Sequence, residues 1–162
     1  MDGKLRNMTA VYISRGEEML LLYRVGSRVV APSYCGVGGH FEVGELNDAR
    51  ACVLRELREE TGLTENDLCG LRMRYVTQRL KNGEVRQNYY FFAGLAPGAQ
   101  APGSSSEGRL EWVPFSGLLQ KEMPHTAYSV IRHYLETGRY TDALYAGATV
   151  EDGVVFTPLS EF

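Results

Sequence analysis

The sequence predicts an α/β fold in which helices cover both faces of a mixed β-sheet, an α/β/α sandwich. Segments of strand character are joined by short polar turns, and two segments have helical periodicity. Mixed strands with a helix for either face give a layered sandwich. The 162 residues, of which 44% are hydrophobic, are enough for one core, so residues 1–162 are expected to form a single domain.

The first half of the chain is expected to begin with a hairpin and end with a helix. Residues 8–14 and 19–24 flank a polar, glycine-containing turn, which indicates two antiparallel strands. Residues 35–38 read as a short strand that ends at a glycine pair. Residues 48–61 are then expected to be helical, with Asp48 as the N-cap and Gly62 as the C-cap.

The second half is expected to complete the sheet and cover its other face. Residues 71–79 and 85–95 bracket an Asn-Gly pair, a strong hairpin signal. A short strand follows at residues 111–113, an amphipathic helix at 126–136 and a terminal hairpin between 141 and 159. The stretch 96–108 is rich in Gly, Ser and Pro, and is either a mobile loop near a site or a plain surface loop.

Composition excludes several kinds of partner. A net charge of −3 and a pI near 5.7 argue against a long nucleic acid, whereas a small anion with a metal ion is compatible with them. The apolar stretches are too short for a membrane span, and the N-terminal residues lack an apolar signal region. The three cysteines are widely spaced and are expected to be reduced thiols. We therefore expect a cytoplasmic protein with no membrane partner; a homodimer stays open.

Three carboxylates of the acidic helix have the spacing of a divalent cation site. Glu56, Glu59 and Glu60 stand at i, i+3 and i+4, within a ~100° arc and ~6 Å of helical rise. Carboxylates are the ligands that Mg²⁺ prefers. The alternative is a solvated helix face, because Arg55 can pair with Glu59 at i+4. The Gly38-Gly39 pair just upstream favours the metal site.

In these residues the chain resembles the Nudix hydrolase family. That signature is Gly, five residues, Glu, seven residues, and then Arg-Glu-apolar-x-Glu-Glu-x-Gly-apolar. Residues 55–63 match its second half at every position, and Gly39 and Glu45 keep the five-residue gap. Nine residues rather than seven separate Glu45 from Arg55, which indicates a two-residue insertion around Leu46-Asn47. The insertion raises the question whether Glu45 still reaches Arg55 in the family's ion pair.

The resemblance implies a Nudix-type sandwich that hydrolyses a diphosphate bond in a nucleoside diphosphate linked to a group X, with Mg²⁺ or Mn²⁺. By residue-wise likeness, Glu56, Glu59, Glu60 and the Gly39 carbonyl would bind the metal, and Arg55 would orient the acids. The general base would be Glu56, or a distal acid as in some members of the family. The candidates for a distal base are Glu107 and Glu111.

Substrate contacts are expected on two strands. Arg24 ends a strand where similar proteins have a phosphate-contacting arginine, although it can also be an ordinary exposed arginine. Asn88 and Tyr90 lie on one side of an alternating aromatic strand, where they can contact a base or simply belong to the core.

The expected ligand is a small-molecule nucleotide, with a nucleoside triphosphate as the first substrate hypothesis, for example an oxidised one such as 8-oxo-dGTP. The alternatives are ADP-ribose, a dinucleoside polyphosphate, or a Nudix-fold module that senses a nucleotide without cleaving it.

Overall fold

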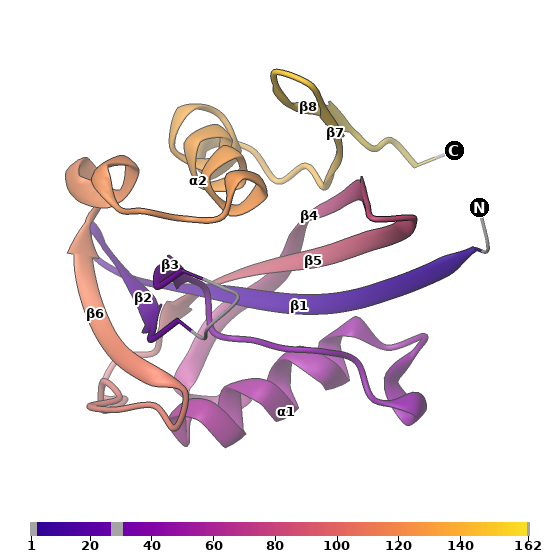
Figure 1. The fold of residues 1–162 in the computed structure, drawn as a ribbon. Helices are drawn as coiled ribbons and strands as arrows, with labels where there is room; N and C mark the ends of the chain where they lie inside the picture. The colour runs from indigo at the N-terminus through magenta and orange to yellow at the C-terminus, as the bar shows by residue number, and fades with distance from the viewer. Residues whose placement is uncertain (1–2, 27–30, 162) are drawn as a thin grey trace.

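The computed structural model describes residues 3–26 and 31–161, and in this part of the chain it contains eight strands and two α-helices. The strands run in the order β3-β2-β1-β5-β4-β7-β8, and β6 pairs with β2 (Figure 1). The strand bounds are β1 Lys4–Arg15, β2 Glu18–Arg24, β3 Ser33–Cys35, β4 Leu68–Lys81, β5 Glu84–Leu95, β6 Gly108–Pro114, β7 Tyr145–Val150 and β8 Gly153–Pro158.

The two helices lie on opposite faces of this sheet (Figure 1), so the predicted α/β/α sandwich is confirmed. Helix α1 comprises Ala49–Thr61, and α2 comprises His125–Glu136. Val53 and Leu57 of α1 are buried in one apolar cluster, and Val130 and Ile131 of α2 in another. No helix of the described ranges is long and apolar enough to cross a membrane.

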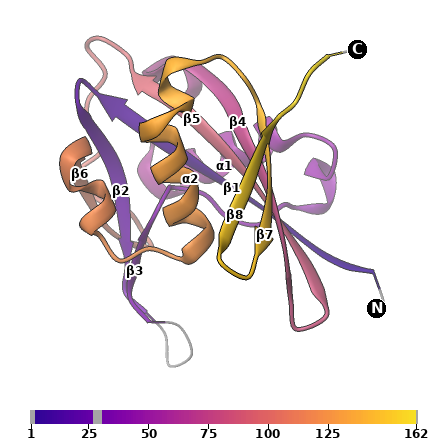
Figure 2. The ribbon, with the colours of Figure 1, turned by 90° about the horizontal axis from the view of Figure 1, so that it is seen from above.

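The sheet is mixed because two of its central pairings are parallel. β1 runs parallel to β5, with paired residues from Lys4↔Glu84 to Ser14↔Gly94, and β4 runs parallel to β7 (Figure 2). The β4–β5 pair is antiparallel and turns at Asn82 and Gly83, whose φ angles of 53° and 73° are those of a type I′ hairpin. The hairpin predicted from this Asn-Gly pair is confirmed.

Side-chain alternation along the central strands assigns each residue to one face. On β1, Val11 and Ile13 pack in the cluster of α1, whereas Tyr12 packs in the cluster of α2. On β5, Phe91 belongs to the α1 cluster, and Tyr90 belongs to the α2 cluster. Residues with the parity of Tyr12 and Tyr90 therefore face α2.

Helix α1 begins where the sequence predicts it. The Asp48 carboxylate accepts a hydrogen bond from the Ala51 N–H at 2.9 Å, and Gly62 closes the helix with φ 76°. A 3-10 turn at Val43–Glu45 precedes the helix. The two extra residues therefore lie in the loop before Asp48 and leave the helix unchanged.

Several strands are longer than predicted: β1 begins at Lys4 rather than at residue 8, β4 spans Leu68–Lys81 rather than 71–79, and β6 spans Gly108–Pro114 rather than 111–113. Two other boundaries are shifted for a local reason. The third strand is Ser33–Cys35 rather than 35–38, because the chain then crosses to β1 and Val37 forms an isolated bridge with Val11. The terminal hairpin starts at Tyr145 rather than at 141, because the carbonyls of Gly138, Thr141 and Ala143 accept hydrogen bonds from the buried Arg74 side chain. These contacts hold residues 138–143 against Arg74 rather than in a strand ladder.

Candidate active site

Arg55 of α1 binds carboxylates from the helix itself and from the 3-10 turn that precedes it. Its Nε and Nη2 donate to the two carboxylate oxygens of Glu45 at 2.7 and 2.9 Å, and its Nη1 donates to Glu56 at 2.9 Å and to Glu59 at 3.1 Å. The bidentate pair lowers the pKa of Glu45 to about 2 and raises that of Arg55. Glu45 therefore reaches Arg55 despite the insertion. The extra residues lie between the 3-10 turn that ends at Glu45 and the N-cap Asp48.

The glycine pair brings backbone against the helix acids. A Cβ on Gly39 would lie 2.5 Å from the Glu56 carboxylate, so only glycine allows this approach. The Gly39 carbonyl accepts a hydrogen bond from the Thr9 N–H at 2.8 Å, which fixes its position and leaves one lone pair. Glu56 and the Gly39 carbonyl can thus serve the same cation.

Glu60 is the most buried acid of the helix, with 4% of its surface exposed. Its carboxylate accepts from Arg24 Nη2 at 3.1 Å and from the Gly38 N–H at 3.2 Å. The pKa of Glu60 is raised to about 7, chiefly by burial; Arg24 opposes the shift and the nearby Glu107 carboxylate contributes to it. A cation at this position would favour the ionised carboxylate.

The loop before β6 delivers Glu107 to the same place. Arg24 pairs with Gly108 across β2 and β6, and a side chain on Gly108 would collide with the Tyr23 carbonyl at 2.1 Å. This close approach brings Glu107 beside Arg24, with Oε2 2.7 Å from Nη2. Arg24 therefore joins Glu60 of the helix to Glu107 of the loop.

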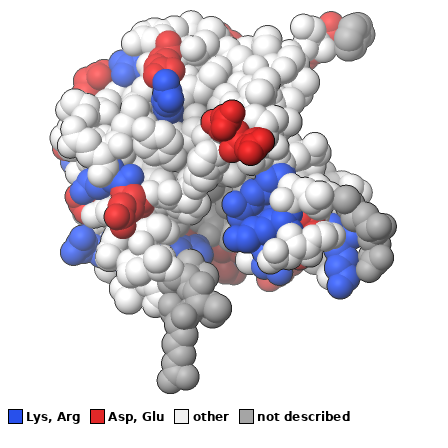
Figure 3. Space-filling view, turned by 45° about the horizontal axis from the view of Figure 1, so that its top comes forward, with Lys and Arg blue, Asp and Glu red and all other residues white. Residues whose placement is uncertain are grey.

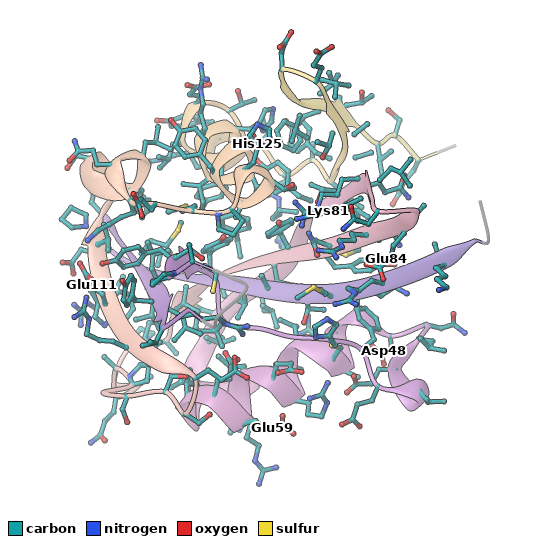
Figure 4. All side chains as sticks on the ribbon, viewed as in Figure 1. Asp48, Glu59, Lys81, Glu84, Glu111 and His125 are labelled. Carbon is teal, nitrogen blue, oxygen red and sulfur yellow. The ribbon has the colours of Figure 1, made fainter. Side chains whose placement is uncertain are left out.

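Glu111 is not part of this group. It shares the parity of Val113, which packs on the α2 side, and Figure 4 shows it on β6 at a distance from Glu59 of α1. Its carboxylate accepts from Lys121 Nζ at 2.6 Å and from the Tyr34 hydroxyl at 2.9 Å, and these partners lower its pKa. The contacts of Glu111 are those of a structural ion pair. The structure thus brings Glu107, and not Glu111, to the helix acids.

The oxygen donors of the site suit a hard divalent cation, although two arginines already bind the same carboxylates. Within residues 3–26 and 31–161, no three His, Cys, Asp or Glu side chains are already arranged around a metal position. Arg55 engages Glu56 and Glu59, and Arg24 engages Glu60. A cation would be held by oxygen donors from these three glutamates and the Gly39 carbonyl, the ligand type that Mg²⁺ prefers.

A cleft of about 320 Å³ leads from Arg24 and Gly38 across the α2 side of the sheet. Asn88 lines this cleft and is half-buried, whereas Tyr90 is 4% exposed and is stacked on Tyr12 with ring centroids 6.3 Å apart. Tyr90 is thus chiefly a core residue that forms part of the floor. The signature glutamates line neither this cleft nor a hollow of about 540 Å³ on the α1 side, beside Phe41. The cleft meets them through Arg24 and Gly38, which both donate hydrogen bonds to Glu60.

Several cleft residues are absent from the sequence-based prediction. Thr126 at the start of α2 is buried and lines the cleft, and its hydroxyl has no hydrogen-bond partner among the described residues. Three arginines, Arg6, Arg79 and Arg86, line the outer part. No local signal marks Thr126. The arginines stand out only when the strand register is known.

Comparison with known proteins identifies the family and the fold. The NUDIX domain model matches residues 4–134. The crystal structure of the mutator MutT protein from Bacillus halodurans is similar, with a TM-score of 0.68 at 23% identity, over 96% of this chain and 95% of that one. The MutT protein from Methanosarcina mazei gives 0.67 at 18% identity, over 84% and 96% of the respective chains.

The fold also occurs in a larger enzyme. The bifunctional NMN adenylyltransferase/ADP ribose pyrophosphatase from Francisella tularensis has a TM-score of 0.66 at 14% identity, over 85% of this chain and 42% of that one. These likenesses concern the fold, while the family model extends over most of the sequence. Together with the signature residues around Arg55, it shows that the chain belongs to the NUDIX family, as a Nudix hydrolase.

Proposed function

We propose that this Nudix hydrolase uses Mg²⁺ or Mn²⁺ to cleave a diphosphate bond in a nucleoside triphosphate or another nucleoside diphosphate-X compound. The observation that carries the proposal is the contact between the signature acids and one end of a nucleotide-sized cleft. Arg24 and Gly38 line that end, and both donate hydrogen bonds to the Glu60 carboxylate. The Glu56 carboxylate lies beside the neighbouring Gly39. Water attacks one phosphorus atom, the bridging P–O bond breaks, and two phosphate-ended products leave. Glu56, Glu59, Glu60 and the Gly39 carbonyl would hold the cation, which would supply positive charge to the phosphates and lower the pKa of the attacking water.

The side chains around the cleft have distinct proposed roles. Arg24 contacts a substrate phosphate, since its guanidinium lies at the cleft end between Glu60 and Glu107. Glu107 accepts the proton of the attacking water. Glu56 is the alternative base, because its carboxylate lies where a Cβ on Gly39 would be 2.5 Å away, next to the carbonyl proposed to bind the metal. Arg55 positions Glu56 and Glu59 and does not line the cleft.

Asn88 is proposed to contact the base, because its side chain lines the cleft next to the floor formed by Tyr90. An oxidised nucleotide such as 8-oxo-dGTP is the first substrate to test. Retention of Glu56, Glu59 and Glu60 argues for an enzyme rather than a sensing module. A cytoplasmic location and a homodimer remain predictions of the sequence.

The test is product release from a panel of nucleoside triphosphates, 8-oxo-dGTP, ADP-ribose and dinucleoside polyphosphates, each with Mg²⁺ and with excess EDTA. We expect turnover of at least one compound with Mg²⁺ and none with EDTA. Glu59→Gln should abolish turnover. Glu65→Gln is the matched control, because Glu65 is exposed and pairs with Arg50 instead. Full activity in EDTA, or equal activity of the two variants, would refute the metal-dependent mechanism.

A further inference from the structure

Three arginines lie side by side on β1, β5 and β4, close to the β4–β5 turn. Arg86 of β5 pairs in register with Arg6 of β1 on one side and with Arg79 of β4 on the other. Directly paired residues of neighbouring strands project from the same face, here the face of α2. Figure 3 shows a compact group of Lys and Arg side chains on this side of the molecule.

These like charges are only partly compensated. Glu84 is the carboxylate among them: it lies 3.1 Å from Arg6 Nε and 2.8 Å from Arg86 Nε (labelled at the β4–β5 tip in Figure 4). Arg79 Nε is buried and has no hydrogen-bond partner within the described residues. Like charges directly opposite each other on a sheet are destabilising. Three guanidinium groups and one carboxylate leave about two positive charges, which match a phosphate dianion.

The three arginines line the same cleft as Arg24. Thr9 binds the Gly39 carbonyl, and Arg6 lies three residues from Thr9 along β1, about 10 Å at the rise of a strand. The distance from the catalytic end to the arginines is thus comparable with the length of a nucleoside. Guanidinium groups bind phosphate through paired hydrogen bonds.

We infer that Arg6, Arg79 and Arg86 form an anion subsite for a phosphate monoester on the part of the substrate that occupies the cleft. The substrate class is then a nucleoside diphosphate compound with an additional phosphate on its ribose. This inference rests on the proposed function for the position of the diphosphate. The anion site itself depends only on the arginines.

The experiment compares ligands that have no diphosphate bond and are therefore not hydrolysed. Calorimetric titration with Mg²⁺ measures the affinities of adenosine 5′-monophosphate and of its 2′,5′- and 3′,5′-bisphosphates. We expect at least one bisphosphate to bind at least about tenfold more tightly than the monophosphate, as one charge-assisted pair would provide. Equal binding of all three would overturn the inference.

Single substitutions test whether the arginines cause the preference for a bisphosphate over the monophosphate. Arg79→Gln and Arg86→Gln should each reduce it to about threefold or less, whereas Arg132→Gln, which removes an equal charge from the exposed face of α2, should leave it unchanged. Glu84→Gln should increase the preference, because it removes the competing carboxylate; a purely structural role of the cluster would instead lower it. If Arg79→Gln fails to fold, Arg86→Gln and Glu84→Gln still decide the result.

Failure of the inference and failure of the proposed function are distinguishable. Glu59→Gln should lose turnover and keep the preference for the bisphosphate, since Glu59 is outside the cleft lining. A preference that is equal in Arg86→Gln and Arg132→Gln would overturn the anion subsite even if hydrolysis is observed. A preference that depends on the arginines, without hydrolysis of any diphosphate, would refute only the proposed reaction.

Discussion

Replacing Glu45 with Gln tests whether this residue still anchors α1 after the two-residue insertion. Glu45 accepts two charge-assisted hydrogen bonds from Arg55, at 2.7 and 2.9 Å, and both side chains are largely shielded, with 12% and 22% exposed. The pKa of Glu45 falls from 4.5 to about 2, which corresponds to about 3 kcal/mol of interaction. Gln keeps one acceptor, so we expect a loss of about 1.5–3 kcal/mol in the free energy of unfolding.

The stability difference between wild type and Glu45→Gln should decrease as the pH falls. The lowered pKa means that the folded protein holds the Glu45 carboxylate ionised, so its stabilisation is complete above pH 4.5 and lost as the pH falls toward 2. The difference between wild type and Glu45→Gln should therefore shrink by roughly 1 kcal/mol between pH 6 and pH 3.5. Urea denaturation at both pH values measures it.

Glu42→Gln is the matched control, because Glu42 is 70% exposed and its Oε1 lies 3.9 Å from Arg55 Nε. Its loss should stay below about 0.5 kcal/mol at both pH values. Equal stability of the two variants, or a Glu45→Gln effect that does not change with pH, would refute the assignment of Glu45 as the anchor.

Three further predictions concern single contacts. Gly39→Ala should lower kcat by about 10²-fold, because the added Cβ would lie 2.5 Å from the Glu56 carboxylate and displace it; turnover at the wild-type rate would contradict this. Asp48→Ala should cost about 1 kcal/mol of unfolding free energy through the lost N-cap, with unchanged kcat, and a loss of activity would argue against a purely structural cap. Tyr75→Phe should cost about 1–2 kcal/mol in urea denaturation, because it removes the 2.9 Å hydrogen bond to His133 Nδ1; a neutral result would show that this ring nitrogen finds another partner.

Features encoded by neighbouring residues could be predicted from the sequence. Asp48 and Gly62 mark the ends of α1 because capping depends on the backbone groups of one helix turn. Asn82 and Gly83 mark the β4–β5 turn because few other residues adopt positive φ. The signature around Arg55 gave the acids of the candidate site for the same reason.

Features that depend on pairing between distant strands could not be predicted. The choice between Glu107 and Glu111 follows from the register of β2 and β6, which aligns Arg24 with Gly108. The alignment of Arg6 with Arg86 follows from the parallel pairing of β1 and β5. A shift of one residue would turn either side chain to the opposite face, and the sequence alone does not fix such a register.

The most direct test of the catalytic arrangement is to compare Glu107→Gln with Glu111→Gln at saturating Mg²⁺ and substrate. Glu107 lies 2.7 Å from Arg24, whereas Glu111 lies 2.6 Å from Lys121. A general base contributes about 10²- to 10⁴-fold to kcat, so Glu107→Gln should lower kcat by that factor and Glu111→Gln should leave it nearly unchanged. A kcat of Glu107→Gln within about threefold of wild type, well short of that range, would contradict the account. So would a Glu111→Gln variant that is folded but has lost most of its kcat.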